Sequence, residues 1–232
     1  MRLFVIALAG CLAVIALAAA ADERPKNIRI CIQFIEVAHP DLTEMLTGPD
    51  TAGPLLHDKA LALAKDGRAK LLETSVVMTR PGQKATVESI REVIYPAEYS
   101  PPGLPQAPPP PKQPLIRPDL YDAWETRNVG TTLEIEPSMA ENGRNIDLRF
   151  VPEIVQLLRL ETFKEYVDQW GDASIRMPVF GTWRLNTSVS LLAGQFEMVG
   201  VINPKPNTPG PATTRKILVF ARADILPVST QP

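Results

Sequence analysis

Short stretches of the chain alternate apolar and polar residues with a period of two, as β-strands do when one face is buried. In the first stretch, at 28–37, the residues Ile28, Ile30, Ile32 and Phe34 share one face. Further strands are expected at 129–136, 146–150, 185–191, 196–202 and 216–223. An Asn142-Gly143 pair supplies a hairpin turn between two of them. Regular strands joined by tight turns predict an antiparallel sheet, sandwich or barrel.

The N-terminal half adds two short helices and a predicted hairpin. Pro40 and Asp41 open the first helix, and the second runs over 55–65. Strands at 70–79 and 84–95 flank a turn at 80–83, which predicts a β-hairpin. The stretch 154–170 is compatible with either a strand or a helix. The preceding strand can continue into it, but its apolar residues recur at near-helical spacing. Those residues are Leu157, Leu160, Phe163, Val167 and Trp170.

A proline-rich segment separates the two halves. Residues 96–118 hold 10 of the 24 prolines, including four in a row at 108–111. Proline lacks the backbone donor that a central strand needs, so we expect an extended surface loop. A spacer is the favoured interpretation, and a recognition segment for an aromatic groove is the alternative.

The first 21 residues are typical of an export signal. Arg2 precedes an uncharged run from Leu3 to Ala21, which ends in four alanines before a charged segment. We therefore predict a signal peptide at 1–21 and one mature domain at 22–232. An uncleaved membrane anchor is one alternative. Lipidation of Cys11 in the box Leu8-Ala9-Gly10-Cys11 is another.

Composition and motifs exclude several classes of function. The formal net charge of -2 gives no basic surface for a nucleic acid. Cys31 is the one thiol outside the predicted signal, and we expect a buried small side chain there. His39 and His57 have no metal-ligand spacing, and Glu134 with Glu136 predicts a solvated strand face. We expect no enzyme, catalytic residue, cofactor or metal site.

Four groups of residues, in this order, resemble the secretin domain of type II and type III secretion and type IV pilus channels. They lie at 69–79 with 82–87, at 129–137 with 142–148, at 187–201 and at 216–223. The resemblance implies a β-rich α+β fold: an antiparallel secretin-like sheet, one or two short helices in the N-terminal half and the Pro-rich loop. Secretins assemble as rings in which each subunit adds strands to a shared barrel in the outer membrane.

The sequence departs from the family pattern at three places. Gly200-Val201 stands where secretins usually have two glycines, and 203–215 replaces an apolar block before the last strand. The periplasmic ring modules that usually precede the domain are also missing from this sequence. Because of these departures, the resemblance does not imply that this chain forms the gate of a secretion channel.

Two functions follow as expectations. The first is a shortened secretin-type subunit, a homo-oligomer exported to the outer membrane or periplasm, with lipid contact and other secretion or pilus components as partners. In that case Phe163, Tyr166 and Trp170 suit a membrane interface, although core packing explains them equally. The second is a soluble periplasmic scaffold that has lost the channel. The polar faces at Asn186, Ser188, Ser190, Asp147 and Arg149 suit either function.

Overall fold

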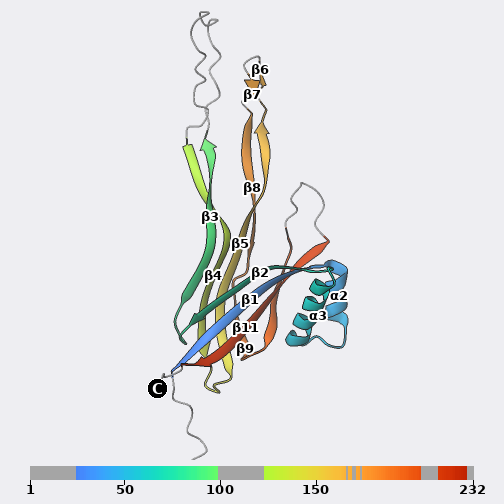
Figure 1. The fold of residues 1–232 in the computed structure, drawn as a ribbon, viewed down its shortest axis with the longest axis vertical. Coiled ribbons are helices and arrows are strands. Elements are labelled where there is room, and N and C mark those ends of the chain that lie inside the picture. The colour runs from blue at the N-terminus through green and yellow to red at the C-terminus, as the bar shows by residue number, and fades with distance from the viewer. Residues whose placement is uncertain are drawn as a thin grey trace, which may run out of the picture.

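Two antiparallel sheets packed face to face form the centre of the protein (Figure 1). The computed structural model describes residues 25–98, 123–165, 167–168, 171–172, 174–204 and 214–228. Sheet A has the strand order β10-β11-β1-β2. Its strands are β1 (Lys26–Ala38), β2 (Lys70–Thr79), β10 (Phe196–Ile202) and β11 (Arg215–Pro227).

Sheet B has the order β3-β4-β5-β8, and β9 also pairs with β5. The strand β5 is long enough to pair β9 along its first residues and β8 along its last ones. The two-residue strands β6 and β7 form a separate small sheet. The bounds are β3 (Ala85–Glu98), β4 (Ala123–Met139), β5 (Asn145–Lys164), β6 (Val167–Asp168), β7 (Gly171–Asp172), β8 (Ile175–Arg184) and β9 (Thr187–Leu192).

The predicted β-rich α+β class is therefore confirmed, with the sandwich among the sheet arrangements that the sequence allowed. The alternating face of β1 enters the core between the sheets as expected. Burying each large apolar side chain there contributes about 1.5–3 kcal/mol. The core residues include Ile28, Ile30, Ile32 and Phe34 from β1, Leu133 and Ile135 from β4, Ile146, Leu148 and Phe150 from β5, and Ile217 and Val219 from β11.

Both predicted helices form and cover the other face of sheet A (Figure 1). They are α2 (His39–Thr47) and α3 (Gly53–Lys65), each with a proline in its first turn. His57 of α3 is buried. Its Nε2–H donates a hydrogen bond to Gln33 Oε1 at 2.7 Å, and its ring stacks on Phe196 with the ring centroids 3.8 Å apart. This histidine therefore helps to dock the helix on the sheet.

The predicted hairpin of β2 and β3 is wrong, and the turn between β9 and β10 behaves in the same way. The strands β2 and β3 do not form a hairpin, because β2 pairs with β1 in sheet A while β3 pairs with β4 in sheet B. Likewise β9 pairs with β5, and the following strand β10 pairs with β11. In both cases the tight turn is real, but it carries the chain from one sheet to the other. A turn motif determines a local reversal and leaves the hydrogen-bonding partner of the next strand open.

Proline is tolerated inside the central strand β5 for a local reason. Pro152 lies between the part of β5 that pairs β9, which ends at Phe150, and the part that pairs β8, which starts at Glu153. Its carbonyl accepts a hydrogen bond from the Leu185 N–H at 3.2 Å. A strand residue points its N–H and C=O to the same side, so the missing donor faces the break between the two neighbouring strands. The N–H that proline lacks would have faced the Leu185 carbonyl, so the ladder loses one hydrogen bond at this break and keeps its pairs on either side, at Phe150–Thr187 and Glu153–Arg184.

A single glycine lets β3 approach β4 where sheet B changes direction. Gly130 has a φ of 141°, and a Cβ atom on it would lie 2.0 Å from the Ser89 carbonyl oxygen. Gly130 is also the last residue of β4 that pairs with β5, opposite Val155. Beyond this pair the two halves of sheet B separate, so the glycine marks the start of the projecting part of the protein.

We expect Gly130→Ala to lower the free energy of unfolding by about 2 kcal/mol or more, through backbone strain and a clash with backbone atoms. The measurement is denaturant unfolding followed by circular dichroism. Gly143→Ala is the matched control, since Gly143 also has a positive φ of 64° but no atom lies within 4 Å of its Cβ position. Equal losses in the two variants would show that close approach at Gly130 has no energetic weight.

The buried imidazole of His57 predicts a pH dependence of stability. Burial lowers its pKa below the usual 6.5, and the nearby Arg222 lowers it further while Asp58 opposes the shift. The unfolded chain then binds the proton more readily, so the free energy of unfolding falls as the pH drops below about 6.5. Unfolding at pH 7.5 and pH 5.5 should show this loss in the wild type and a smaller loss in His57→Phe. An equal loss in both proteins would contradict the assignment.

Candidate functional site: free edges and two projecting arms

Half of sheet B extends beyond the sandwich as two separate hairpins (Figure 1). The first arm consists of residues 90–98 of β3 and 123–129 of β4, which stay paired as far as Glu98 and Ala123. The second arm consists of residues 156–164 of β5 and 175–182 of β8, with β6 and β7 beyond them. The predicted Pro-rich loop at 96–118 starts inside β3 at Pro96, on an edge strand, and most of it lies outside the described residues.

The two arms touch at one aromatic side chain. Phe180 of β8 lies 5.6 Å from the Tyr95 ring of β3, centroid to centroid, and the Arg127 guanidinium of β4 lies 5.2 Å from its centroid. Arg127 Nη2 also donates a hydrogen bond to Thr182 Oγ1 at 3.1 Å. The Tyr95 hydroxyl donates to Glu125 Oε2 at 2.9 Å, and this hydrogen bond to a carboxylate raises the pKa of the tyrosine. Sequence reasoning missed this contact, because no local pattern relates residues 95, 127 and 180.

Large apolar side chains on both arms face solvent. The open segment 154–170 resolves as strand as far as Lys164, so the helical interpretation is wrong. Phe163 is exposed and does not pack into the core, whereas Tyr166 and Trp170 lie outside the residues whose side chains are described. The exposed fractions are 64% for Ile94, 58% for Trp124, 61% for Leu160, 69% for Phe163 and 73% for Val167.

Both sheets end in strands whose outer sides have no partner among the described residues. In sheet B these are β3 on one side and β8 with β9 on the other, and in sheet A they are β10 and β2. An unpaired edge exposes a row of backbone N–H and C=O groups that another strand can bind. The edge strand β3 is 14 residues long and mostly exposed. These edges therefore leave backbone hydrogen-bonding groups open to another strand.

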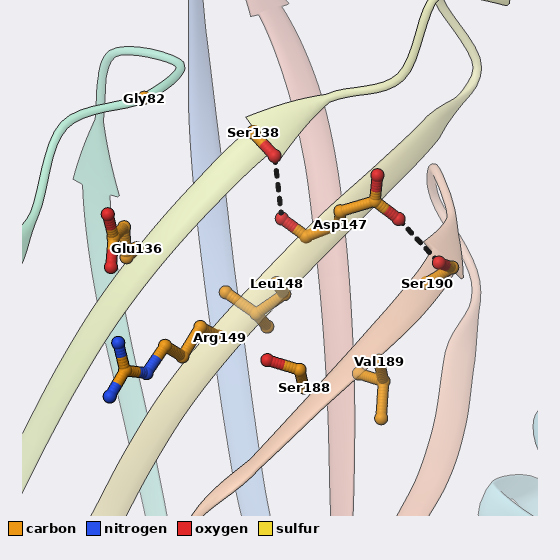
Figure 2. A pocket seen from close by; sticks show the side chains of 9 residues that line it. All are labelled: Gly82, Glu136, Ser138, Asp147, Leu148, Arg149, Ser188, Val189 and Ser190. Carbon is orange, nitrogen blue, oxygen red and sulfur yellow. Dashed lines mark hydrogen bonds between the residues drawn. The ribbon is translucent and has the colours of Figure 1, made fainter.

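A polar groove lies across β4, β5 and β9 on the outer face of the sandwich (Figure 2). The predicted polar faces do meet here: Asp147, Arg149, Ser188 and Ser190 line the groove, while Asn186 is exposed just before β9. Ser190 donates a short hydrogen bond to Asp147 Oδ1. Glu136 also lines the groove, and Glu134 instead forms an ion pair with Lys84 at 2.8 Å. The groove is an open strand surface lined mainly by polar side chains.

The structure places the other singled-out residues away from these features. His39 begins α2 at the surface, and His57 is held in the helix interface. Cys31 is half-buried on the face of β1 opposite Ile30 and Ile32, so the expected full burial is wrong, and burial raises the pKa of its thiol. Across the described residues, no three metal-ligating side chains gather. No helix in the described part of the chain is long and apolar enough to cross a bilayer.

Several solved structures resemble the chain at low sequence identity. The pilotin–secretin AspS–GspD complex of ETEC is 14% identical with a TM-score of 0.45, and the match covers 95% of this chain and 53% of that one. The Salmonella SPI-1 type III secretion injectisome secretin InvG is 12% identical with a TM-score of 0.42, over 97% and 71% of the two chains. The type II secretin GspD of enteropathogenic Escherichia coli is 15% identical with a TM-score of 0.43, over 94% and 73%. The chain spans about half the length of the first of these proteins, and no curated protein matches it.

More than half of the sequence matches one family model. Residues 62–206 match the Secretin family, described as bacterial type II and III secretion system protein. This range covers more than half of the chain and includes β2, β3, β4, β5, β8, β9 and β10. It also contains three of the four groups of residues that suggested the resemblance, so that expectation is confirmed. The chain belongs to the secretin family.

Proposed function

We propose that this chain is a subunit of an outer-membrane export assembly, and that copies of it join through their edge strands into a closed ring. The observation that carries this proposal is the five-stranded antiparallel sheet B, whose four-strand path β3-β4-β5-β8 has no partner among the described residues at either end, in a chain of the secretin family. Closing a sheet through neighbouring copies removes every exposed edge at once. Cyclic assembly with the same head-to-tail contact at each step achieves this closure.

The even number of strands supports this arrangement. The strands β3, β4, β5 and β8 alternate in direction, so β3 and β8 run in opposite directions. When a rotated copy is placed beside the first, its β3 meets β8 antiparallel, and the ladder continues without a change of type. The same holds for β10 and β2 at the edges of sheet A. Two concentric closed sheets can therefore form from one kind of subunit.

The exposed apolar residues of the second arm supply a lipid-facing surface in this proposal. Leu160 and Phe163 on β5 and Val167 on β6 are all more than half exposed, which is costly in water and favourable in the hydrocarbon region. The predicted signal peptide at 1–21 lies outside the described residues and supplies export to the periplasm. One mature domain at 22–232 remains our interpretation of the chain. Other secretion or pilus components, and a homo-oligomeric state, are proposed partners on the same grounds.

A soluble periplasmic scaffold is the second candidate, and the polar groove around Asp147 and Arg149 favours it. Such a groove has no place against lipid, although it also suits the water-filled interior of a ring. In this alternative the Pro-rich segment supplies the contact with a partner protein.

The full-length chain, expressed with its own N-terminus, should be recovered from the membrane fraction as a high-mass species. The measurement is fractionation, followed by size-exclusion chromatography and electron microscopy in mild detergent. Closed rings are expected because each copy satisfies the edges of its neighbours. A monomer confined to the periplasmic fraction would overturn the ring and leave the scaffold.

Charged residues on the second arm should release the protein from the membrane. In Leu160→Lys/Phe163→Lys, each lysine in the hydrocarbon region costs about 2–4 kcal/mol near the bilayer centre. We expect a large drop in the fraction that stays in the pellet after a carbonate wash. Leu55→Lys is the matched control, because Leu55 is a similarly exposed leucine on α3, away from the arms. An unchanged pellet fraction in the double variant would remove the lipid contact from the proposal.

A further inference from the structure

The two edges of sheet B carry opposite charge. The β3 strand has three glutamates, Glu88, Glu92 and Glu98, against one arginine, Arg91. The β8 strand has two arginines, Arg176 and Arg184, and no acidic residue. Both arginines and all three glutamates are exposed. Opposite charge on the two edges favours contact between different edges and disfavours contact between like edges.

The strand pairing places the central charges on one face of sheet B and at one level. Glu88 pairs with Thr132, Thr132 with Glu153, and Glu153 with Arg184. Directly opposite residues on paired strands share a face, so Glu88 and Arg184 lie at the two ends of one row across the sheet. Arg184 Nε lies 3.8 Å from Glu153 Oε2, which confirms that this part of the row shares a face.

Within one copy these two charges cannot meet at this level. Three strand spacings separate them, or roughly 14 Å at about 4.8 Å per strand. The Glu88 carboxylate has no ion pair among the described residues, and Arg184 has only the long contact with Glu153. Both are therefore available to a second copy.

We propose that Arg184 at the β8 edge of one copy forms an ion pair with Glu88 or Glu92 at the β3 edge of the next copy. The proposal rests on the proposed function and adds the residues that select and align the contact. The strand that pairs with each edge comes from another copy of this chain, because the charges of the two edges are complementary.

The spacing of the glutamates suits the geometry of a closed sheet. Strands in a closed sheet are tilted, which shifts each copy along the strand relative to its neighbour. With no shift Arg184 faces Glu88, and a shift of four residues in one direction brings Glu92 to the same place on the same face. A shift of four residues in the other direction brings Lys84 to Arg184, where like charges repel. The charges therefore select the direction of the shift.

The same charges disfavour a two-fold dimer. Pairing β8 with β8 brings the arginines of two copies together, and pairing β3 with β3 does the same for the glutamates. Either contact uses a two-fold axis and occupies one edge of each copy, so the same head-to-tail contact cannot repeat from copy to copy around a ring. The head-to-tail contact is the one that neutralises both edges, so the charge pattern directs assembly toward a ring.

Charge reversal in the full-length chain tests this contact. Arg184→Glu alone and the double variant Glu88→Arg/Glu92→Arg alone should each raise the protein concentration at half assembly by roughly tenfold or more. An equimolar mixture of the two proteins should assemble at near the wild-type concentration. When copies of the two variants alternate, the glutamate introduced at position 184 of one faces the new arginines of the next, and Arg184 of that copy faces Glu88 and Glu92 of the one after it. The measurement is size-exclusion chromatography in mild detergent across a dilution series. Arg144→Glu and Glu141→Arg are the matched controls, since both residues are exposed in the β4–β5 turn.

The mixture separates a role in assembly from a role in folding. Arg184→Glu places a second acid beside Glu153, so thermal unfolding of each variant is measured as well. A folding defect in one chain is not repaired by adding another chain, whereas a contact between copies is restored. If the wild type forms rings and the variants assemble like the controls, or if the mixture is not restored, the charge contact is wrong and the ring stands. If the wild type forms no ring, the proposed function fails first.

Discussion

Packing of the two sheets against each other is the interaction on which the rest of the structure depends. One face of sheet A and one face of sheet B share a single apolar core, and the two helices close the other face of sheet A. Sheet A covers only part of sheet B. The uncovered part extends as two arms, so the same core that stabilises the sandwich also determines where the arms begin.

The arms are held at their base by features of a few residues. β4 and β5 stop pairing at Gly130 and Val155, and Gly130 permits the close approach of β3 that no other residue allows. Beyond that point the contacts around Phe180 join the two arms.

The unpaired edges are the parts of the sandwich that can bind another strand. Each open edge can bind another strand through backbone hydrogen bonds, because it exposes a row of donors and acceptors. Such an edge is a liability unless its partner is specified. Here the opposite charges of β3 and β8 supply specificity where the backbone alone has none. Apolar residues on the second arm and polar residues around Asp147 then divide the surface into lipid-facing and water-facing regions in the proposed ring.

Local sequence patterns predicted both helices, the family and most of the strands, but no pattern predicted β8. Alternation around Ile30 and Leu133, the proline at the start of the first helix and the Asn142-Gly143 turn are local signals, and the structure confirms each of them. The motif order identified the secretin family without any contact between distant residues. Strand pairing, in contrast, follows from tertiary contacts: β3 pairs with β4 and not with β2, and β10 pairs with β11 and not with β9. The contact between Tyr95 and Phe180 is of the same kind. Period and turn type constrain only neighbours in the chain, whereas the partner of a strand depends on which distant segment buries the same face.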